Sequence, residues 1–513
     1  MTIDLRQTLS AGSEPLSTGF AAHEDDTGRT PVVLIIGGGY AGAALTMRLL
    51  ERRRSKLHVV IAEPQASLGR GQAYSTTETA QLMNGPAGNF SLYPDDPSHL
   101  ARWVANAEGS RQNGDDAADR FIPRGLFGRY VEEQLARTIT AADTSVQVSH
   151  WRCEVVKLRR NDVGGWRAWF RDGRELDADR IVLATGVFPL ARDPALTPLG
   201  QQWRLSTPWQ PEKLDRLSRV QDILIVGASL SMVDTVASLE SRGFCGRYRV
   251  ISRRGHLIEP VRTAGEPIDI LDPDDLPRTT RALLALVIAA RRKLQAERRD
   301  WQVLPLSLRP FILPLWQGAT AQERRRFIRH LKALWDVTAH RAAPPSFAAI
   351  EAARTEGRFH ASAARLVSVL QHNNRIDVTL RPRGKQQTVT IAVDGIVDAR
   401  GHQEHDWSRI RSPLVQDLLE TGIVRRHESG FGIDATPDGQ IIDHDGHQNG
   451  DLFAIGHPLR GVAWESSSLT EIRAQASALA DRLCASLTLV ENKFTESVAW
   501  SARHRMILKE ESA

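Results

Sequence analysis

A short glycine-rich segment, Gly37-Gly38-Gly39-Tyr40-Ala41-Gly42, has the spacing G-x-G-x-x-G. In such a turn Gly37 permits a tight reversal, Gly39 lets a pyrophosphate approach the backbone, and Gly42 lets a helix pack closely on a strand. Glu63, a little over 20 residues further on, can accept hydrogen bonds from a ribose 2′-hydroxyl. The pattern predicts a dinucleotide site. The alternative, a glycine-rich surface turn, explains neither the apolar strand before the glycines nor the acid after them.

The flanking sequence predicts the elements that would position these groups. An apolar run, Val32 to Ile36, is typical of a buried parallel strand, and Leu57 to Ala62 predicts a second strand that ends at Glu63. The residues between Gly42 and Leu57 predict a helix whose first N–H groups and dipole can bind phosphate.

The same arrangement recurs in the middle of the chain. Asp222 to Val226 predicts a strand, the next turn is Gly227-Ala228-Ser229-Leu230-Ser231-Met232, and a helix and a strand, Tyr248 to Ile251, follow. Ser229 and Met232 replace two of the three glycines of the first turn. We interpret this segment as a second dinucleotide unit, with Gly227 and Ser229 at its turn.

The residues after the second unit differ in charge from Glu63. Arg253 and Arg254 stand where the first unit has its acid. Guanidinium groups bind a ribose 2′-phosphate, which a carboxylate repels, so the second site should prefer NADPH to NADH. The alternative is a solvated strand end.

Three later strands also end in residues that can lie against a ligand. Antiparallel meanders lead to Ala184-Thr185-Gly186 and to Asp398-Ala399-Arg400-Gly401. The closing strand runs from Asp451 to Gly456. Thr185, Gly186, Asp451 and Gly456 are therefore candidate cofactor contacts.

Residues 260–345 depart from the strand pattern and predict a helical insert. Thr320-Ala-Gln-Glu323 is a capping box that predicts a helix with Phe327, Leu331, Leu334 and Trp335 on one face. As a unit the insert, beside the second nucleotide site, is a plausible lid, with Trp316 and Trp335 as shielding side chains. Aromatic residues at helical spacing are more often core.

Composition excludes several classes of protein. The net charge of +5 is small for 513 residues, and the scattered arginines do not argue for nucleic acid. The apolar run from Ala282 to Ala290 is about half the length that spans a bilayer. The chain has three cysteines, Cys153, Cys245 and Cys484, and they form no C-x-x-C motif. We therefore expect no redox-active disulfide, and we expect the protein in a reducing cytoplasm. No His/Cys cluster has metal-ligand spacing.

The chain resembles the FAD/NAD(P)-binding flavoproteins with two dinucleotide sites, the group related to flavin-dependent N-hydroxylases and flavin-containing monooxygenases. The segments that carry this resemblance are GRGQAYST (Gly69–Thr76), LMNGPAG (Leu82–Gly88), YPDDPSHLARW (Tyr93–Trp103), IPRGLFGRY (Ile122–Tyr130), ATGVFP (Ala184–Pro189) and GVAWESSSLTEIRAQA (Gly461–Ala476). The resemblance implies FAD at the first site and NADPH (or NADH) at the second. ATGVFP departs from the commoner ATGY, which argues against hydroxylation of ornithine or lysine.

We therefore expect an α/β fold with two Rossmann-like dinucleotide-binding units, β-meander inserts and a helical insertion. Its expected parts are a disordered leader (1–30), the first part of an FAD domain (31–205), an NAD(P)H domain (206–395) with the insert at 260–345, the closing part of the FAD domain (396–490) and a tail (491–513).

The expected function is an NAD(P)H-driven, FAD-dependent monooxygenase that uses O₂ to hydroxylate a small nitrogen-containing molecule. A urate-type ring hydroxylase of purine metabolism is the preferred specific assignment. The alternatives are an amino-acid N-hydroxylase, a flavin oxidoreductase without oxygen insertion, and a non-catalytic FAD-binding redox sensor. The sequence identifies no catalytic side chain, no metal ligand, no membrane segment and no oligomeric state.

Overall fold

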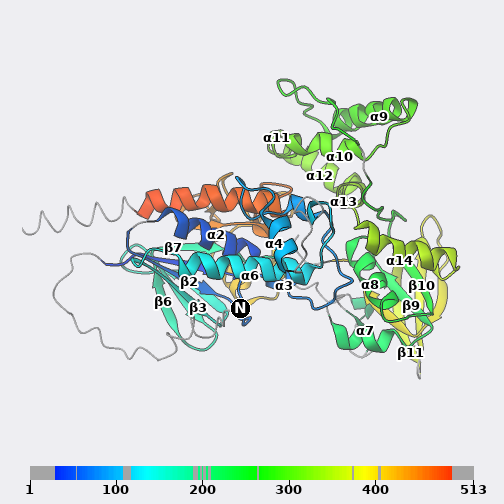
Figure 1. The fold of residues 1–513 in the computed structure, drawn as a ribbon, viewed down its shortest axis with the longest axis horizontal. Helices are drawn as coiled ribbons and strands as arrows, with labels where there is room; N and C mark the ends of the chain where they lie inside the picture. The colour runs from blue at the N-terminus through cyan, green and yellow to red at the C-terminus, as the bar shows by residue number, and fades with distance from the viewer. Residues whose placement is uncertain are drawn as a thin grey trace, which may run out of the picture.

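The computed structural model describes residues 29–487 except 54, 108–116, 189–193, 197–198, 200–203, 206–209, 263–264, 373–374 and 402–405. The predicted leader and tail lie outside these residues, apart from 29 and 30. The described chain forms two α/β units side by side, with a group of helices projecting from the second (Figure 1).

The first unit is built on a six-stranded sheet with the order β15-β16-β7-β1-β2-β3. All neighbouring pairs are parallel except β15 and β16. Its strands are β1 (Val32–Ile36), β2 (Leu57–Ala62), β3 (Val146–Trp151), β7 (Arg180–Leu183), β15 (Gln440–Ile442) and β16 (Gln448–Ala454).

Both faces of this sheet are covered, which explains the continuous apolar runs of its strands. Val33 and Ile35 face a core formed with helices α2 (Tyr40–Arg52), α4 (His99–Ala107), α6 (Arg124–Thr140) and a closing helix at residues 469–487. Leu34 and Ile36 face the other core, formed with α15 (Pro413–Glu420) and an antiparallel meander of β4 (Val155–Arg160), β5 (Trp166–Phe170) and β6 (Glu175–Ala178). Short helices lie at α3 (Gly71–Tyr74), Ala87–Asn89, Trp407–Arg409 and His457–Gly461.

The second unit has a seven-stranded sheet with the order β13-β12-β11-β10-β9-β14-β8. Its strands are β8 (Arg204–Leu205), β9 (Asp222–Val226), β10 (Arg247–Ser252), β11 (Phe359–His372), β12 (Arg375–Pro382), β13 (Val389–Val393) and β14 (Gly395–Asp398). The helices α7 (Pro211–Leu217), α8 (Leu230–Glu240) and α14 (Pro344–Thr355) pack on one face, and a short helix lies at Pro194–Leu196.

Two strands lie in a different unit from the one that the sequence predicts. Residues 204–205 and 396–398 pair with the second sheet, since β14 lies between β9 and β8. The predicted boundaries at 205/206 and 395/396 place them in the first unit, and this is wrong. The strands are only two to four residues long, and only their pairing partners decide to which sheet they belong.

The insert is helical, as predicted, and contains α9 (Thr280–Ala296), α10 (Val303–Leu308), a turn at Arg309–Phe311, α11 (Ile312–Gly318), α12 (Ala321–His330) and α13 (Lys332–Ala339). The Thr320 side chain accepts a hydrogen bond from the Glu323 N–H, as a capping box predicts. The predicted single helix after it is wrong, because the chain breaks at Leu331 into α12 and α13.

Candidate functional site

The first glycine turn lies where β1, β7 and β16 end. Gly37 has φ +109°, and a Cβ there would lie 2.3 Å from the carbonyl oxygen of Ala184. A Cβ at Gly42 would lie 2.1 Å from the carbonyl oxygen of Gly37. Both contacts are far shorter than any real Cβ contact, so these two positions admit only glycine. The turn is therefore built for close approach of backbone segments.

Helix α2 begins at this turn with its first N–H groups uncapped. Gly39 is the N-cap residue and no side chain caps the helix. A Cβ on Gly39 would lie 3.3 Å from the Cα of Gly71, so this position is also crowded. Gly456, at the end of β16, lies beside the same helix, since a Cβ there would be 3.6 Å from the Cβ of Ala41. The sequence-predicted residues from three strands thus converge on one helix N-terminus.

Two polar side chains complete the arrangement. The half-buried Glu63 carboxylate accepts hydrogen bonds at 3.0 Å from the N–H of Gly38 and of Gln65, which fixes it at the end of β2. Among the described residues, the buried hydroxyl oxygen of Thr185 has no hydrogen-bond partner, and Gly186 follows with φ +64°. An uncapped helix, a held acid and an orphaned hydroxyl fit the phosphates and hydroxyls of a dinucleotide. The contact of each with FAD stays a prediction.

Asp451 lies elsewhere, and its prediction as a cofactor contact has no structural support. It lies in the middle of β16, and the turn lies beyond the end of that strand. Its carboxylate accepts a hydrogen bond from the indole N–H of Trp166 at 2.9 Å and pairs with Arg160. Asp451 therefore joins the meander to the sheet.

The second turn repeats the geometry of the first. Gly227 has φ +120°, and a Cβ there would lie 2.3 Å from the carbonyl oxygen of Ala399, at the end of β14. Ser229 is the N-cap residue of α8, and its side chain makes no capping hydrogen bond. Met232, in place of the third glycine, is fully buried in the core beneath the helix. A side chain is tolerated at that position because it points into the core.

The two predicted phosphate-binding arginines have different surroundings. Arg253 is exposed, and among the described residues its side chain has no hydrogen-bond or ion-pair partner. Arg254 donates to the carbonyl oxygen of His330 at 2.6 Å and to that of Arg329, at the end of α12. Arg254 thus joins the second sheet to the insert, and Arg253 is the side chain available to a 2′-phosphate.

The insert reaches the first unit through tryptophans. Trp316 packs against Trp464 with the two rings tilted by 40° and their centroids 4.7 Å apart, and its indole N–H donates to the carbonyl of Gly461 at 2.7 Å. Trp335 donates to the Glu465 carboxylate at 2.9 Å. The indole nitrogen of Trp464 and the hydroxyl of Ser466 are buried and have no hydrogen-bond partner in the described part of the chain. The insert is thus in contact with the segment that follows Gly456.

A cavity of about 220 Å³ opens beside this contact. It is lined mainly by apolar side chains of the insert helices, with Trp464 as its member from the first unit. Trp316 and Trp335 both line it. The predicted lid residues therefore lie at the boundary between the insert and the first unit, and their gating role stays a prediction.

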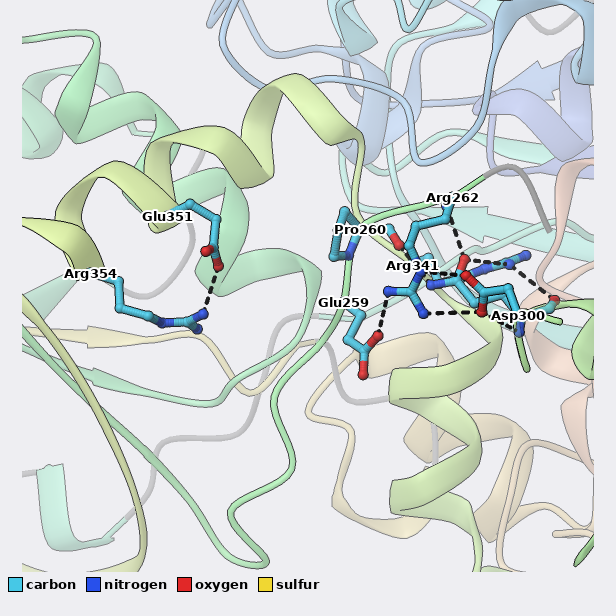
Figure 2. Close-up of polar contacts among 8 residues, drawn as sticks. Glu259, Pro260, Arg262, Asp300, Arg341, Glu351 and Arg354 are labelled. Carbon is cyan, nitrogen blue, oxygen red and sulfur yellow. Dashed lines mark hydrogen bonds and ion pairs between the residues drawn. The ribbon is translucent and has the colours of Figure 1, made fainter. Parts of the chain in front are cut away.

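Polar contacts hold the base of the insert, and Figure 2 shows those that involve Glu259, Arg262 and Asp300. The entering and leaving strands meet where Val261 donates to the carbonyl of Ala342 at 2.8 Å. Arg262 pairs with both Glu259, at 2.7 Å, and Asp300, at 2.6 Å. The fully buried Gln302 donates to the carbonyl of Pro260 at 2.9 Å. The insert is thus attached by a cross-linked neck.

Sequence reasoning missed a set of residues between the two units. Asp234, Ser238 and Arg242 are spaced by four along and just beyond α8, a helix whose other residues are mostly apolar. They contact Arg124, Gln81 and Glu78 of the first unit. A charged residue in the middle of an apolar helix, with polar residues at the same spacing, is the signal that would have pointed to them.

The sequence predicts neither a metal site nor a membrane-spanning helix. In the described part of the chain, Asp443, Asp445 and His447 have ligand atoms within 4.8 Å of one another, on the exposed turn between β15 and β16. Exposed acidic turns are common without an ion, and no role is assigned to this one. Among the described residues, no helix combines the length and the apolar character that a bilayer crossing requires.

Comparison with known proteins identifies the first unit. Residues 34–188 match the family model described as FAD-NAD(P)-binding. A curated relative, nitrosuccinic acid synthase from Aspergillus oryzae, is 25% identical over 238 residues, which cover 42% of this chain and 36% of that protein. The chain therefore spans about a third of the length of this relative.

The fold is shared with solved flavin enzymes. Ornithine N-hydroxylase from Kutzneria sp. 744 matches with a TM-score of 0.61 and 14% identity, over 88% of this chain and 98% of that chain. The FAD-bound cadaverine monooxygenase from Erwinia amylovora matches with a TM-score of 0.61 and 14% identity, over 88% and 93%. Identity this low shows the fold alone. Residues 34–188 therefore form a domain that matches the FAD-NAD(P)-binding model, and the chain shares the overall fold of these solved enzymes.

Proposed function

We propose that the chain is an FAD-dependent, NAD(P)H-driven monooxygenase that N-hydroxylates a small primary amine. The observation that carries the proposal is the duplicated turn. Gly37 lies against the carbonyl of Ala184, and Gly227 lies against the carbonyl of Ala399. At either glycine, an added Cβ would be 2.3 Å from the facing carbonyl oxygen. Each turn precedes an uncapped helix. The first turn would suit FAD, which stays bound, and the second would suit NAD(P)H, which delivers hydride.

The residues of the first turn would hold FAD. The uncapped N-terminus of α2 would bind phosphate, Glu63 would accept from a ribose hydroxyl, and Thr185 would supply its unpaired hydroxyl. Bound FAD supplies the redox chemistry with O₂. The second turn, with Ser229 at the start of α8 and Arg253 beyond β10, would bind NADPH. Trp316, Trp335 and Trp464 would exclude water from the space between the units.

Support for an amine substrate comes from the relatives. The structural neighbours include an ornithine N-hydroxylase and a cadaverine monooxygenase, and the curated relative is a nitrosuccinic acid synthase. All three names describe oxidation at nitrogen or of an amine-bearing molecule. They favour the N-hydroxylase alternative over the urate-type ring hydroxylase that the sequence suggested. The departure of ATGVFP from ATGY is therefore weak evidence against an amino-acid substrate.

The test is a substrate screen with the purified, FAD-loaded protein. Ornithine, lysine, cadaverine, aspartate (the amine with the carbon skeleton of nitrosuccinic acid) and urate are each added, and NADPH oxidation and hydroxylamine formation are followed. We expect one amine to accelerate oxidation and to yield a hydroxylamine. Acceleration by urate alone, with a hydroxylated ring as product, would contradict the N-hydroxylase proposal. If no compound accelerates NADPH oxidation and the product is only hydrogen peroxide, the result would favour a flavin oxidoreductase without oxygen insertion.

A further inference from the structure

One face of α8 carries three polar side chains at a spacing of four residues. Asp234, Ser238 and Arg242 follow one another along this face, with Arg242 two residues beyond the end of the helix. Residues four apart in a helix lie one above another, so the three form a single stripe. The stripe faces the first unit, since each of its members contacts a side chain from that unit.

Each contact is short and at least partly buried. Asp234, which is 3% exposed, pairs with Arg124 at 3.0 Å. Ser238 accepts a hydrogen bond from the side-chain amide of Gln81 at 3.1 Å, and both are fully buried. Arg242 donates to both carboxylate oxygens of Glu78, at 2.6 and 2.7 Å.

The three partners in the first unit are themselves tied together. The Arg124 N–H donates to the carbonyl of Gln81 at 2.9 Å, and its guanidinium donates to that of Leu82 at 3.1 Å. The Glu78 N–H donates to the hydroxyl of Thr76, which in turn donates to Gln81. The polar stripe of the second unit thus contacts a surface of the first unit whose residues are joined to one another by hydrogen bonds. Bidentate and buried pairs of this kind fix orientation as well as distance.

This contact also explains sequence that the cofactor sites leave unassigned. Residues 76–82 belong to the long irregular segment after Glu63, and Arg124 lies in the IPRGLFGRY segment. A Cβ at Gly125 would lie 2.3 Å from the carbonyl oxygen of Thr76, so these two segments are packed against each other. From these segments the side chains of Glu78, Gln81 and Arg124 contact the second unit.

We infer that Glu78, Arg124, Asp234 and Arg242 are positioning residues that fix the orientation of α8 toward the first unit. Helix α8 begins at the Gly227 turn, so its orientation sets where a nucleotide on that turn points. Where it concerns hydride transfer, the inference rests on the proposed function. In that function the stripe orients the bound NADPH so that its nicotinamide points toward the first site. The contact between the units is independent of that function.

The test is a double-mutant cycle on Glu78 and Arg242. Glu78→Gln, Arg242→Gln and the double variant are compared with Glu78→Asp, which keeps the carboxylate. The control is Asp215→Asn, which removes the other carboxylate bonded to Arg242, at 2.7 Å, from within the second unit. Two quantities are measured. One is hydrogen exchange of residues 76–82 and of α8 in the cofactor-free chain. The other is the limiting rate of anaerobic flavin reduction by NADPH in the loaded protein.

We expect faster exchange at both segments in the Gln variants, and limiting reduction slowed by tenfold or more. FAD content and NADP⁺ affinity should stay within about twofold of the wild type. The double variant should be little worse than either single variant, Glu78→Asp should recover part of the rate, and Asp215→Asn should behave as wild type. Unchanged exchange would overturn the inferred contact, and faster exchange with an unchanged reduction rate would overturn its role in positioning. A wild-type chain that NADPH does not reduce would refute the proposed function instead, and the exchange result would still decide the contact.

Discussion

The indole rings of Trp316 and Trp464 join the helical insert to the first unit. Their centroids are 4.7 Å apart, and Trp316 is only 6% exposed. Phe327 and Phe431 make edge contacts with Trp464, at 5.2 Å each. Such a cluster contributes both packing and a barrier to water, and separate variants are needed to distinguish these two roles.

Replacing Trp316 tests the barrier. Trp316→Phe keeps a ring in the stack but removes the hydrogen bond to Gly461, which should cost about 1 kcal/mol of stability. Trp316→Ala should cost about 3–5 kcal/mol. If the ring also excludes water, the alanine variant should release more hydrogen peroxide per NADPH consumed while keeping its FAD. The matched control is Trp301→Phe, another tryptophan that lines the cavity. Unchanged coupling in a folded Trp316→Ala protein would remove the barrier role.

The first glycine turn can be tested at Gly39. Gly39→Val should abolish FAD binding, because the new Cβ would lie 3.3 Å from the Cα of Gly71 and the valine methyl groups would fill the space for a pyrophosphate. The measurement is the ratio of flavin to protein after purification with added FAD. Gly173→Val is a suitable control, since a Cβ there meets nothing within 4 Å, although its φ of +89° carries some strain. A fully loaded Gly39→Val protein would show that the site is elsewhere.

The two arginines after β10 should give different phenotypes. Arg253→Ala should weaken NADPH binding by tenfold or more, about 1.4 kcal/mol, and leave NADH nearly unaffected. Arg254→Ala should mainly loosen α12, whose last carbonyls Arg254 binds, and so raise hydrogen exchange there. Dissociation constants for both nucleotides, measured with each single variant, decide between these expectations. Equal binding of NADH and NADPH by the wild type would contradict the predicted preference.

Asp234 should make stability depend on pH. Burial raises the pKa of this carboxyl to about 6, and the nearby Arg124 only partly offsets the effect. The folded state therefore holds the proton more tightly than the unfolded chain does. The resulting stability is fully present below about pH 4 and is lost as the pH rises through about 6. Over this range the change is on the order of 3 kcal/mol.

Asp234→Asn should remove this part of the pH profile, because the amide does not titrate. Unfolding by urea at several values between pH 4 and 7.5 measures it, with Asp215→Asn as the exposed control. A variant that retains the wild-type dependence would contradict the assignment of this titration to Asp234.

The neck of the insert can be tested at Gln302. Its side chain accepts from the Arg262 N–H at 3.0 Å, donates to the carbonyl of Pro260 and accepts from Arg341 at 3.1 Å. Gln302→Ala should leave these buried groups unpaired and destabilise the neck by about 1–3 kcal/mol. Limited proteolysis should then cut near residues 260–262 or 340–342 faster than in the wild type, with FAD content unchanged. Equal cleavage rates would show that the neck does not depend on Gln302.

The sequence alone determined the local units of this protein. Strand, glycine turn, helix and strand follow one another within about 30 residues in each unit, and their apolar periodicity and glycine spacing depend only on neighbours in the chain. For that reason Gly37, Gly42 and Gly227 were identified as positions that need glycine. The helical character of the insert and the cap at Thr320 were predicted on the same local grounds.

The tertiary structure decided the contacts between segments that are distant in sequence. Asp451 bonds to Trp166, 285 residues away, and Arg254 bonds to the end of α12, more than 70 residues away. Residues 396–398 join the second sheet through their pairing with β9, which lies more than 160 residues earlier in the chain. The pairing of Asp234 with Arg124 depends on how two complete units dock. No local pattern encodes these partners, because a charged or apolar side chain acquires its role only from the surface that packing brings against it.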